Sequence, residues 1–147
     1  MIQPRSSRVL RTVRDTILQN RVRGMISLNH MKKFLAVYMG SPEALAHYRA
    51  MEESVRKEKD AAGMSAWMKW ATDNKKAITD MGSPVGKTKR IDKNGISDIK
   101  NEIGAYTVVE AESHEAAAKL FLNHPHFMIF PGDRVEVMEC LSIPQRL

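Results

Sequence analysis

The sequence predicts an α+β domain in which an antiparallel sheet is covered by helices on one face. Stretches typical of strands outnumber stretches typical of helices, which leaves too few helices to cover both faces of a sheet. The dipeptide Asn94-Gly95, between two such strands, is the strongest short-range signal for a β-hairpin. At 147 residues the chain is long enough for one domain with a single core.

The first half of this domain is expected to hold a strand and two helices. Lys33–Met39 (KFLAVYM) is apolar on both faces, so this strand must be covered on both sides. Ser41 and Pro42 begin a helix with a capping hydroxyl and a proline at the first helical position. Gly63 is expected to break or bend that helix, and Ser65 to cap a second one.

The second half is expected to consist of strands, one helix and a loop. Gly82-Ser83-Pro84 predicts a turn. Cys140 falls in the middle of the last strand and is expected to be a small core residue. The predicted elements are, in order, strand Ala77–Met81, hairpin strands Val85–Asp92 and Ile96–Ile99, strand Tyr106–Ala111, a helix capped by Ser113, and strand Val135–Leu141.

Two of these strands, Phe34–Met39 and Tyr106–Val109, are apolar on faces that the predicted helices cannot cover. A second sheet, supplied by another copy of the chain, would bury those faces. We therefore predict a homodimer whose sheets pack face to face.

The net charge of +6 is concentrated in the first 30 residues. This segment carries six arginines against one aspartate, whereas the other 117 residues carry 17 basic and 16 acidic side chains. A nucleic-acid partner would depend on this segment alone, so we do not expect one. Residues 1–30 are expected to form a poorly ordered basic arm and residues 31–147 the domain. The arm could be a transit peptide, a phosphate- or membrane-binding segment, or an extension upstream of a natural start at Met31.

Cysteine content and hydropathy indicate a soluble, cytoplasmic protein. One cysteine allows neither an intrachain disulfide nor a cysteine-built zinc site. The longest apolar run, about Phe34 to Met39, is far shorter than the roughly 20 residues of a membrane span. The sequence contains no glycine-rich phosphate loop, serine-nucleophile elbow or dinucleotide fingerprint. We therefore expect no cofactor and no membrane partner.

The motifs of the chain resemble a known family. The similarity to the YCII-related proteins, close to the DGPF-domain group, spans about Met31 to Pro144 and rests on FLAVYM, the turn at residues 82–84, and IGAYTVVEAESHEAAAKLFLNHPHF followed by PGDRVEVMECLSIP. It implies a ferredoxin-like protomer that pairs into a dimeric α/β barrel, in agreement with the expected dimer. The Asp-Gly-Pro-Phe tetrad is replaced by Ile96–Ile99, and the place of a family histidine that pairs with an aspartate falls near Ser65. The resemblance therefore implies a fold and leaves the chemistry open.

His124-Pro125-His126 is the most concentrated chemical feature of the chain. An extended segment would point both imidazoles to the same side, where one could act as a general base near neutral pH. Two histidines make only half a metal site, even with Asp133 or Glu139 nearby, so no metal is expected. In the alternative interpretation His124 ends a helix, stabilised by the helix dipole, and the proline turns the chain.

Acidic and aromatic side chains could complete a site with these histidines. Glu139 lies among apolar residues of the last strand, which suits a general acid or a ligand anchor. Alternatively, Glu139 pairs at the sheet rim with Arg134 or a lysine. Asp80 could join a small polar group at one end of the sheet. The candidate ligand contacts are Tyr106, Trp67 and Trp70, and the tryptophans are also candidate core or interface residues.

Two functions remain open at this point. The first is a cofactor-independent enzyme that holds a small organic molecule of aromatic or lactone type and moves a proton with His124 or His126, assisted by Glu139 or Asp80. The second is a non-catalytic ligand-binding or interaction dimer, in which the same residues only cap and brace the structure.

Overall fold

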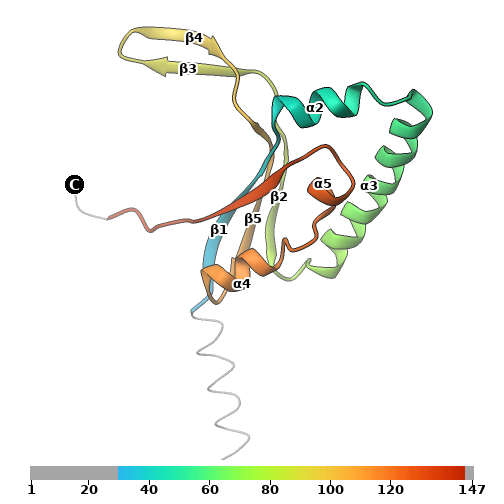
Figure 1. Cartoon of the computed structure of the whole chain (residues 1–147). Helices are drawn as coiled ribbons and strands as arrows, with labels where there is room; N and C mark the ends of the chain where they lie inside the picture. The colour runs from blue at the N-terminus through green and yellow to red at the C-terminus, as the bar shows by residue number, and fades with distance from the viewer. Residues whose placement is uncertain (1–29, 145–147) are drawn as a thin grey trace, which may run out of the picture. The chain divides into compact units, whose positions relative to one another are not determined.

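Four antiparallel strands form the main sheet, in the spatial order β2 (Ile78–Pro84), β5 (Ile103–Ala111), β1 (Lys32–Met39) and β6 (Arg134–Glu139). This computed structural model describes residues 30–144, and every element lies in one unit that begins at Lys32. Helical connections follow β1 and precede β6, so the topology is the βαββαβ arrangement of ferredoxin-like folds (Figure 1). The predicted α+β class with an antiparallel sheet is confirmed.

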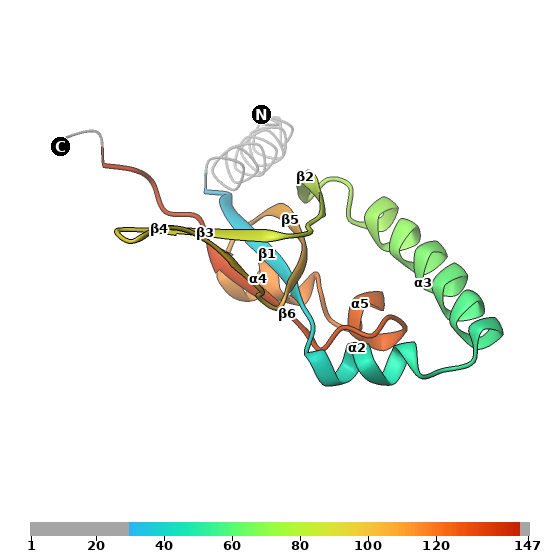
Figure 2. The ribbon, with the colours of Figure 1, turned by 90° about the horizontal axis from the view of Figure 1, so that it is seen from above.

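The helices of the domain are α2 (Pro42–Arg49), α3 (Glu53–Asp73), α4 (His114–Lys119) and α5 (Pro125–Met128). Two of them begin at the predicted caps. The Ser41 hydroxyl accepts a hydrogen bond from the backbone N–H of Ala44 at 3.1 Å, and the Ser113 hydroxyl accepts one from Ala116 at 3.0 Å. In Figures 1 and 2, α3, α4 and α5 lie on the same side of the main sheet.

The core lies between the sheet and these helices. Phe34 and Tyr38 of β1 and Val109 of β5 are completely buried. Trp70 of α3 and Phe121, which follows α4, pack against them. Burying side chains of this size stabilises the fold by roughly 1.5–3 kcal/mol each.

The described helices leave the other face of the main sheet open. Because side chains alternate along a strand, Leu35 and Val37 of β1 point away from the helices, although Val37 is only 7% exposed. The register places Leu35 opposite both Val108 and Met138, so the three side chains share this face. Met138 is 44% exposed. The open face is therefore apolar at its centre.

Gly63 does not break the helix. It lies in the middle of α3, which runs unbroken for 21 residues, so the predicted division and the cap at Ser65 are wrong. A Cβ at Gly63 would lie 2.5 Å from the ring of Phe130. Glycine is needed here because an aromatic ring packs directly on the helix backbone, a reason that only the tertiary structure supplies.

Gly82, predicted in a turn, lies inside strand β2. The pairing of β2 with β5 shifts register between Asp80 and Ser83, and Gly82 has a φ of +69°. A Cβ at this position would lie 1.8 Å from the carbonyl oxygen of Tyr106. The residues form a β-bulge rather than a turn. Only glycine fits at position 82, because its backbone passes directly against the carbonyl of Tyr106.

The predicted hairpin is confirmed. Within residues 30–144, strands β3 (Thr88–Asp92) and β4 (Gly95–Ile99) pair only with each other, and Gly95 has a φ of +111° beside Asn94. In both views the hairpin points away from α3 (Figures 1 and 2).

The segment around the two histidines is helical, so the predicted extended loop is wrong. His124 is the N-cap of α5 and Pro125 occupies its first helical position. The extended backbone of His124, with φ −63° and ψ 142°, satisfies the restriction that the following proline imposes. The proline then begins a helix, as it does in α2.

Some predictions fall at the edges of the structure. The basic arm, residues 1–30, lies almost wholly outside the described range of 30–144 and stays a prediction. Within that range no helix combines the length and apolar character needed to cross a membrane. Cys140 follows β6 and is exposed, so its predicted place in the core is wrong. The backbone N–H of Cys140 donates a hydrogen bond of 2.9 Å to the carbonyl oxygen of Lys33. This places Cys140 at the end of the sheet, beyond the core.

Candidate functional site

A pocket of about 410 Å³ lies between α3, the bulged end of β2, the start of β5 and the segment around α5. Among the described residues that line it, none is acidic and none is a lysine or an arginine. The walls are mainly thioether and aromatic side chains, which suits a neutral organic ligand. The residues that line it include Met64, Trp67, Met81, Tyr106, His126 and Phe130.

Three glycines allow this pocket to form. Gly63 lets the Phe130 ring reach α3, and Gly82 forms the bulge beside Tyr106. Gly132 lies against the His126 ring, where a Cβ would be 2.2 Å from Cε1 and Nε2. The backbone therefore leaves room for a ring at Gly63 and Gly132, and for the Tyr106 carbonyl at Gly82.

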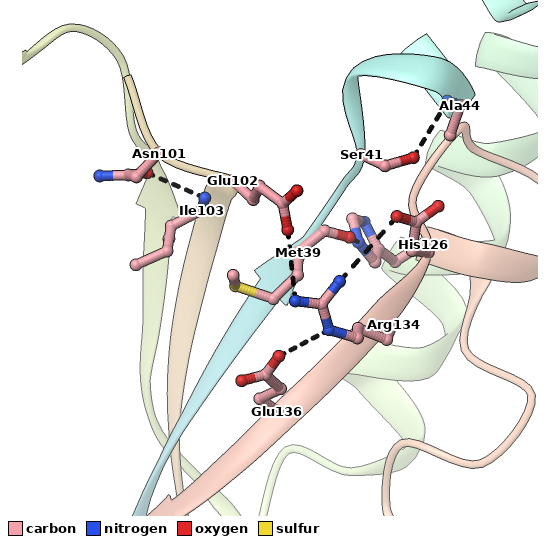
Figure 3. A network of polar contacts seen from close by, with 10 residues as sticks. Met39, Ser41, Ala44, Asn101, Glu102, Ile103, His126, Arg134 and Glu136 are labelled. Atoms are coloured by element: carbon pink, nitrogen blue, oxygen red, sulfur yellow. Dashed lines mark hydrogen bonds and ion pairs between the residues drawn. The ribbon is translucent and has the colours of Figure 1, made fainter. Parts of the chain in front are cut away.

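His126 is the histidine of the pocket wall. Its Nε2 donates a hydrogen bond of 2.7 Å to the carbonyl oxygen of Met39 (Figure 3). A carbonyl oxygen can only accept, so Nε2 carries the proton in the neutral imidazole. The lone pair then resides on Nδ1, the nitrogen that can take a proton from a ligand.

Burial and nearby charges act in opposite directions on His126. Burial lowers the pKa of His126, while the Met39 carbonyl, the Asp133 carboxylate and the backbone of Arg134 oppose that change. The net direction is downward from 6.5, so His126 is neutral at pH 7. Arg134 in turn pairs with Asp133 at 3.9 Å, and also with Glu102 and Glu136 (Figure 3). Arg134 therefore connects Asp133, the acidic residue that acts on His126, to two further carboxylates.

His124 lies behind the pocket and is completely buried. Its ring is surrounded by Tyr38, Trp67, Trp70 and Phe121, with centroid distances of 5.1, 4.6, 4.6 and 5.9 Å. Burial, with a smaller contribution from His126, lowers the pKa of His124 to about 4. His124 is therefore uncharged at neutral pH.

A buried chain of hydroxyl groups connects the core to the pocket. Thr107 donates to the Met81 carbonyl oxygen at 3.0 Å, so the Tyr38 hydroxyl, 3.0 Å from Thr107, is the donor to Thr107. Burial raises the pKa of Tyr38 to about 12, against the smaller effect of its bond to Thr107. Tyr38 thus stays a neutral phenol that braces the strand carrying Met81. The sequence held no signal for this, because Thr107 has the β-branched character of any strand residue.

Three of the residues predicted for a site line the pocket, namely His126, Trp67 and Tyr106. The other two aromatic candidates, His124 and Trp70, lie in the core behind it. Trp70 donates from Nε1 to the Leu120 carbonyl oxygen at 2.7 Å, which satisfies its polar atom without a ligand.

The two acidic candidates do not lie with His126. Glu139 pairs with Lys32 at 3.3 Å and lies opposite Phe34 of β1. Phe34 is five residues from Met39, the residue whose carbonyl binds His126. That spacing corresponds to about 17 Å along the strand. Asp80 accepts a hydrogen bond from the backbone N–H of Gly82 at 2.8 Å and so stabilises the bulge. The geometry instead brings Asp133 to His126, a residue that the sequence indicated only as a possible metal partner.

Within residues 30–144, no three histidine, cysteine, aspartate or glutamate side chains gather in a metal-binding arrangement. The neighbouring imidazoles of His124 and His126 use Nδ1 and Nε2, respectively, for backbone hydrogen bonds.

Comparison with known proteins finds a weak likeness to a solved structure. No protein-family model and no curated protein matches the sequence. Among solved structures, the chain is similar to 5-chloro-2-hydroxyhydroquinone dehydrochlorinase (TftG) from Burkholderia phenoliruptrix AC1100, in complex with 2,5-dihydroxybenzoquinone. The TM-score is 0.42 and the identity 21%, over 71% of this chain and 89% of that chain. A likeness at this level assigns neither a family nor an activity.

Proposed function

We propose that this protein is an acid/base enzyme that binds a small, neutral organic molecule in the pocket and moves a proton with His126. The observation that carries the proposal is a neutral imidazole in an apolar pocket wall, with its Nε2 proton held by the Met39 carbonyl. An imidazole that is neutral at pH 7 and has a lone pair on its other nitrogen suits a general base. No metal or other cofactor enters this proposal.

Each neighbour of His126 has a role in the proposed step. Nδ1 of His126 takes a proton from the neutral bound molecule, so the molecule becomes an anion and the imidazole becomes a positively charged imidazolium, which later returns a proton to the molecule. The Asp133 carboxylate, which already favours the charged form of His126, stabilises this imidazolium. Trp67 holds the molecule through its ring, and Tyr106 lines the pocket beside the bulge. The apolar walls limit screening by water, which strengthens these charge effects.

Replacing His126 by asparagine tests the proton transfer. The probe is 2-coumaranone, a neutral aromatic lactone with an acidic C–H group, and the readout is deuterium uptake from D₂O followed by proton NMR. We expect the wild-type protein to accelerate uptake and His126→Asn to reduce that acceleration by at least about a hundredfold, the usual scale of general-base catalysis. His47→Asn, a change of an exposed histidine on α2, should leave it unchanged.

Equal rates in wild type and His126→Asn would show that His126 is not the base. Binding of the probe without acceleration over buffer would favour the second candidate, a non-catalytic ligand-binding dimer. That candidate is favoured by one observation, the lack of acidic and strongly basic side chains among the described residues of the pocket.

We also propose that the chain forms a homodimer through the open faces of its main sheets. Leu35, Val108 and Met138 give that face an apolar centre, and another copy is the direct means to cover it. The motif resemblance to YCII-related proteins supports the same arrangement, a dimeric α/β barrel.

A lysine on the open face should weaken this dimer. Met138→Lys places a charge at the proposed interface, yet the side chain is 44% exposed in the protomer, so the protomer should fold. We expect the dimer dissociation constant to rise at least about tenfold in sedimentation equilibrium. Leu122→Lys, at a position 69% exposed between α4 and α5, is the matched control and should have no effect. A wild-type monomer at micromolar concentration would contradict the dimer, and an unaffected Met138→Lys dimer would place the interface elsewhere.

A further inference from the structure

His124 connects the aromatic core to the backbone of α5. Its Nδ1 accepts a hydrogen bond of 3.0 Å from the backbone N–H of His126. Because Nδ1 must be unprotonated to accept, the neutral ring carries its proton on Nε2. The polar contact therefore fixes the tautomer of His124 and the position of the next imidazole together.

The Nε2–H of His124 has no hydrogen-bond partner in the core. A buried donor without an acceptor costs on the order of 1–3 kcal/mol, a cost that a leucine or phenylalanine in the same space would avoid. An apolar residue, however, could not accept the N–H of His126. Histidine therefore differs from these residues in one respect, because its Nδ1 can accept the hydrogen bond from the backbone N–H of His126.

The rings that enclose His124 also touch the pocket. Tyr38 lies 5.3 Å and Trp67 6.3 Å from the ring of His126, centroid to centroid. Trp67 is 4.6 Å from His124 at 90° and 6.0 Å from Phe130. A shift of His124 would therefore move a pocket wall as well as the helix that carries His126.

We infer that His124 is a positioning residue for His126: its Nδ1 and its uncharged ring hold α5, Tyr38 and Trp67 so that His126 keeps its Nε2 proton on the Met39 carbonyl. The titratable groups that face the two imidazoles are Tyr38 from β1 and Asp133 from the segment before β6. The relevance to catalysis depends on the proposed function, but the geometric claim can be tested without any substrate.

The test is an NMR titration of histidine-labelled protein, which reports the tautomer and the pKa of His126. In His124→Asn the side-chain oxygen replaces Nδ1 as the acceptor, and asparagine is itself a favoured N-cap. In His124→Leu the core space is filled but the acceptor is lost. We expect His126 of the asparagine variant to keep its Nε2–H tautomer and to titrate within about 0.3 pH unit of wild type. In the leucine variant the tautomer preference should be lost and the midpoint should rise toward that of a free histidine.

Ser113→Ala is the matched control, because it removes an equivalent cap bond of 3.0 Å from α4. It should leave the titration of His126 unchanged. A leucine variant with the wild-type tautomer and midpoint would overturn the inference, as would an equal shift in Ser113→Ala.

A second measurement on the wild-type protein applies even if the leucine variant does not fold. The nitrogen spectrum of His124 should show an unprotonated Nδ1 at pH 7, coupled across the hydrogen bond to the amide of His126. A protonated Nδ1 would overturn the inference. A failed exchange assay together with these NMR results would refute the proposed enzyme while leaving the positioning role intact.

Discussion

Gly82→Ala is expected to destabilise the protein by about 2–4 kcal/mol, the scale of a side chain forced into a positive-φ site with a steric conflict. The φ of Gly82 is +69°, which is costly for any residue with a Cβ. The added methyl would lie 1.8 Å from the carbonyl oxygen of Tyr106, and a backbone atom in a paired strand cannot move aside as a side chain can. The free energy of unfolding from urea denaturation is the measurement.

The control for this change lies four residues away. A Cβ at Gly86 would meet nothing within 4 Å, and its φ is not in the positive region. Gly86→Ala should therefore change the free energy of unfolding by no more than about 1 kcal/mol and can be stabilising, because it restricts the unfolded chain. Equal effects of the two substitutions would show that the bulge at Gly82 is not rigid.

Acidification from pH 7 to pH 4 should lower the free energy of unfolding by about 3 kcal/mol through His124. Each unit of difference between the folded and unfolded pKa of a group contributes about 1.36 kcal/mol. The pKa of His124 is about 4 in the folded protein and 6.5 in the unfolded chain. Between these values the unfolded chain binds a proton that the folded protein does not, so the free energy of unfolding falls as the pH falls. The loss begins near pH 6.5 and is complete near pH 4. His126, whose pKa is also lowered by burial, acts in the same direction.

His124→Asn isolates this effect because asparagine does not titrate. Urea denaturation at pH 7 and at pH 4 should show a pH-dependent loss that is smaller in the variant by about 3 kcal/mol. Titration of carboxylates contributes equally to both proteins and cancels in the comparison. The same loss in wild type and variant would mean that His124 becomes protonated within the folded core.

The parts of the fold with local signals could be predicted from the sequence. Ser41 and Ser113 cap helices because a hydroxyl at that position binds a free N–H three residues later, whatever surrounds it. Asn94-Gly95 forms a hairpin turn because its backbone conformation favours glycine. The strand Lys33–Met39 is predictable because its residues are apolar at successive positions, as in a strand covered on both faces.

The parts that depend on distant contacts could not be predicted. Gly63 and Gly82 resembled a helix breaker and a turn, and their functions depend on Phe130 and Tyr106, which are remote in sequence. The segment around His124 and His126 is helical because Pro125 occupies the first position of α5. Proline follows the end of some helices and begins others, so its presence alone did not distinguish a loop from a helix.

The sequence by itself determined most of the secondary-structure order of this protein and its antiparallel α+β class, and it indicated the two histidines as candidate site residues. It did not determine their roles. The tertiary structure buries His124 among aromatic rings and leaves His126 in the pocket wall beside Asp133, while Glu139 lies at the far end of the strand. The physical reason is that helix caps and turns are decided by neighbouring residues, whereas burial and charge pairing are decided by which segments the sheet and helices bring together.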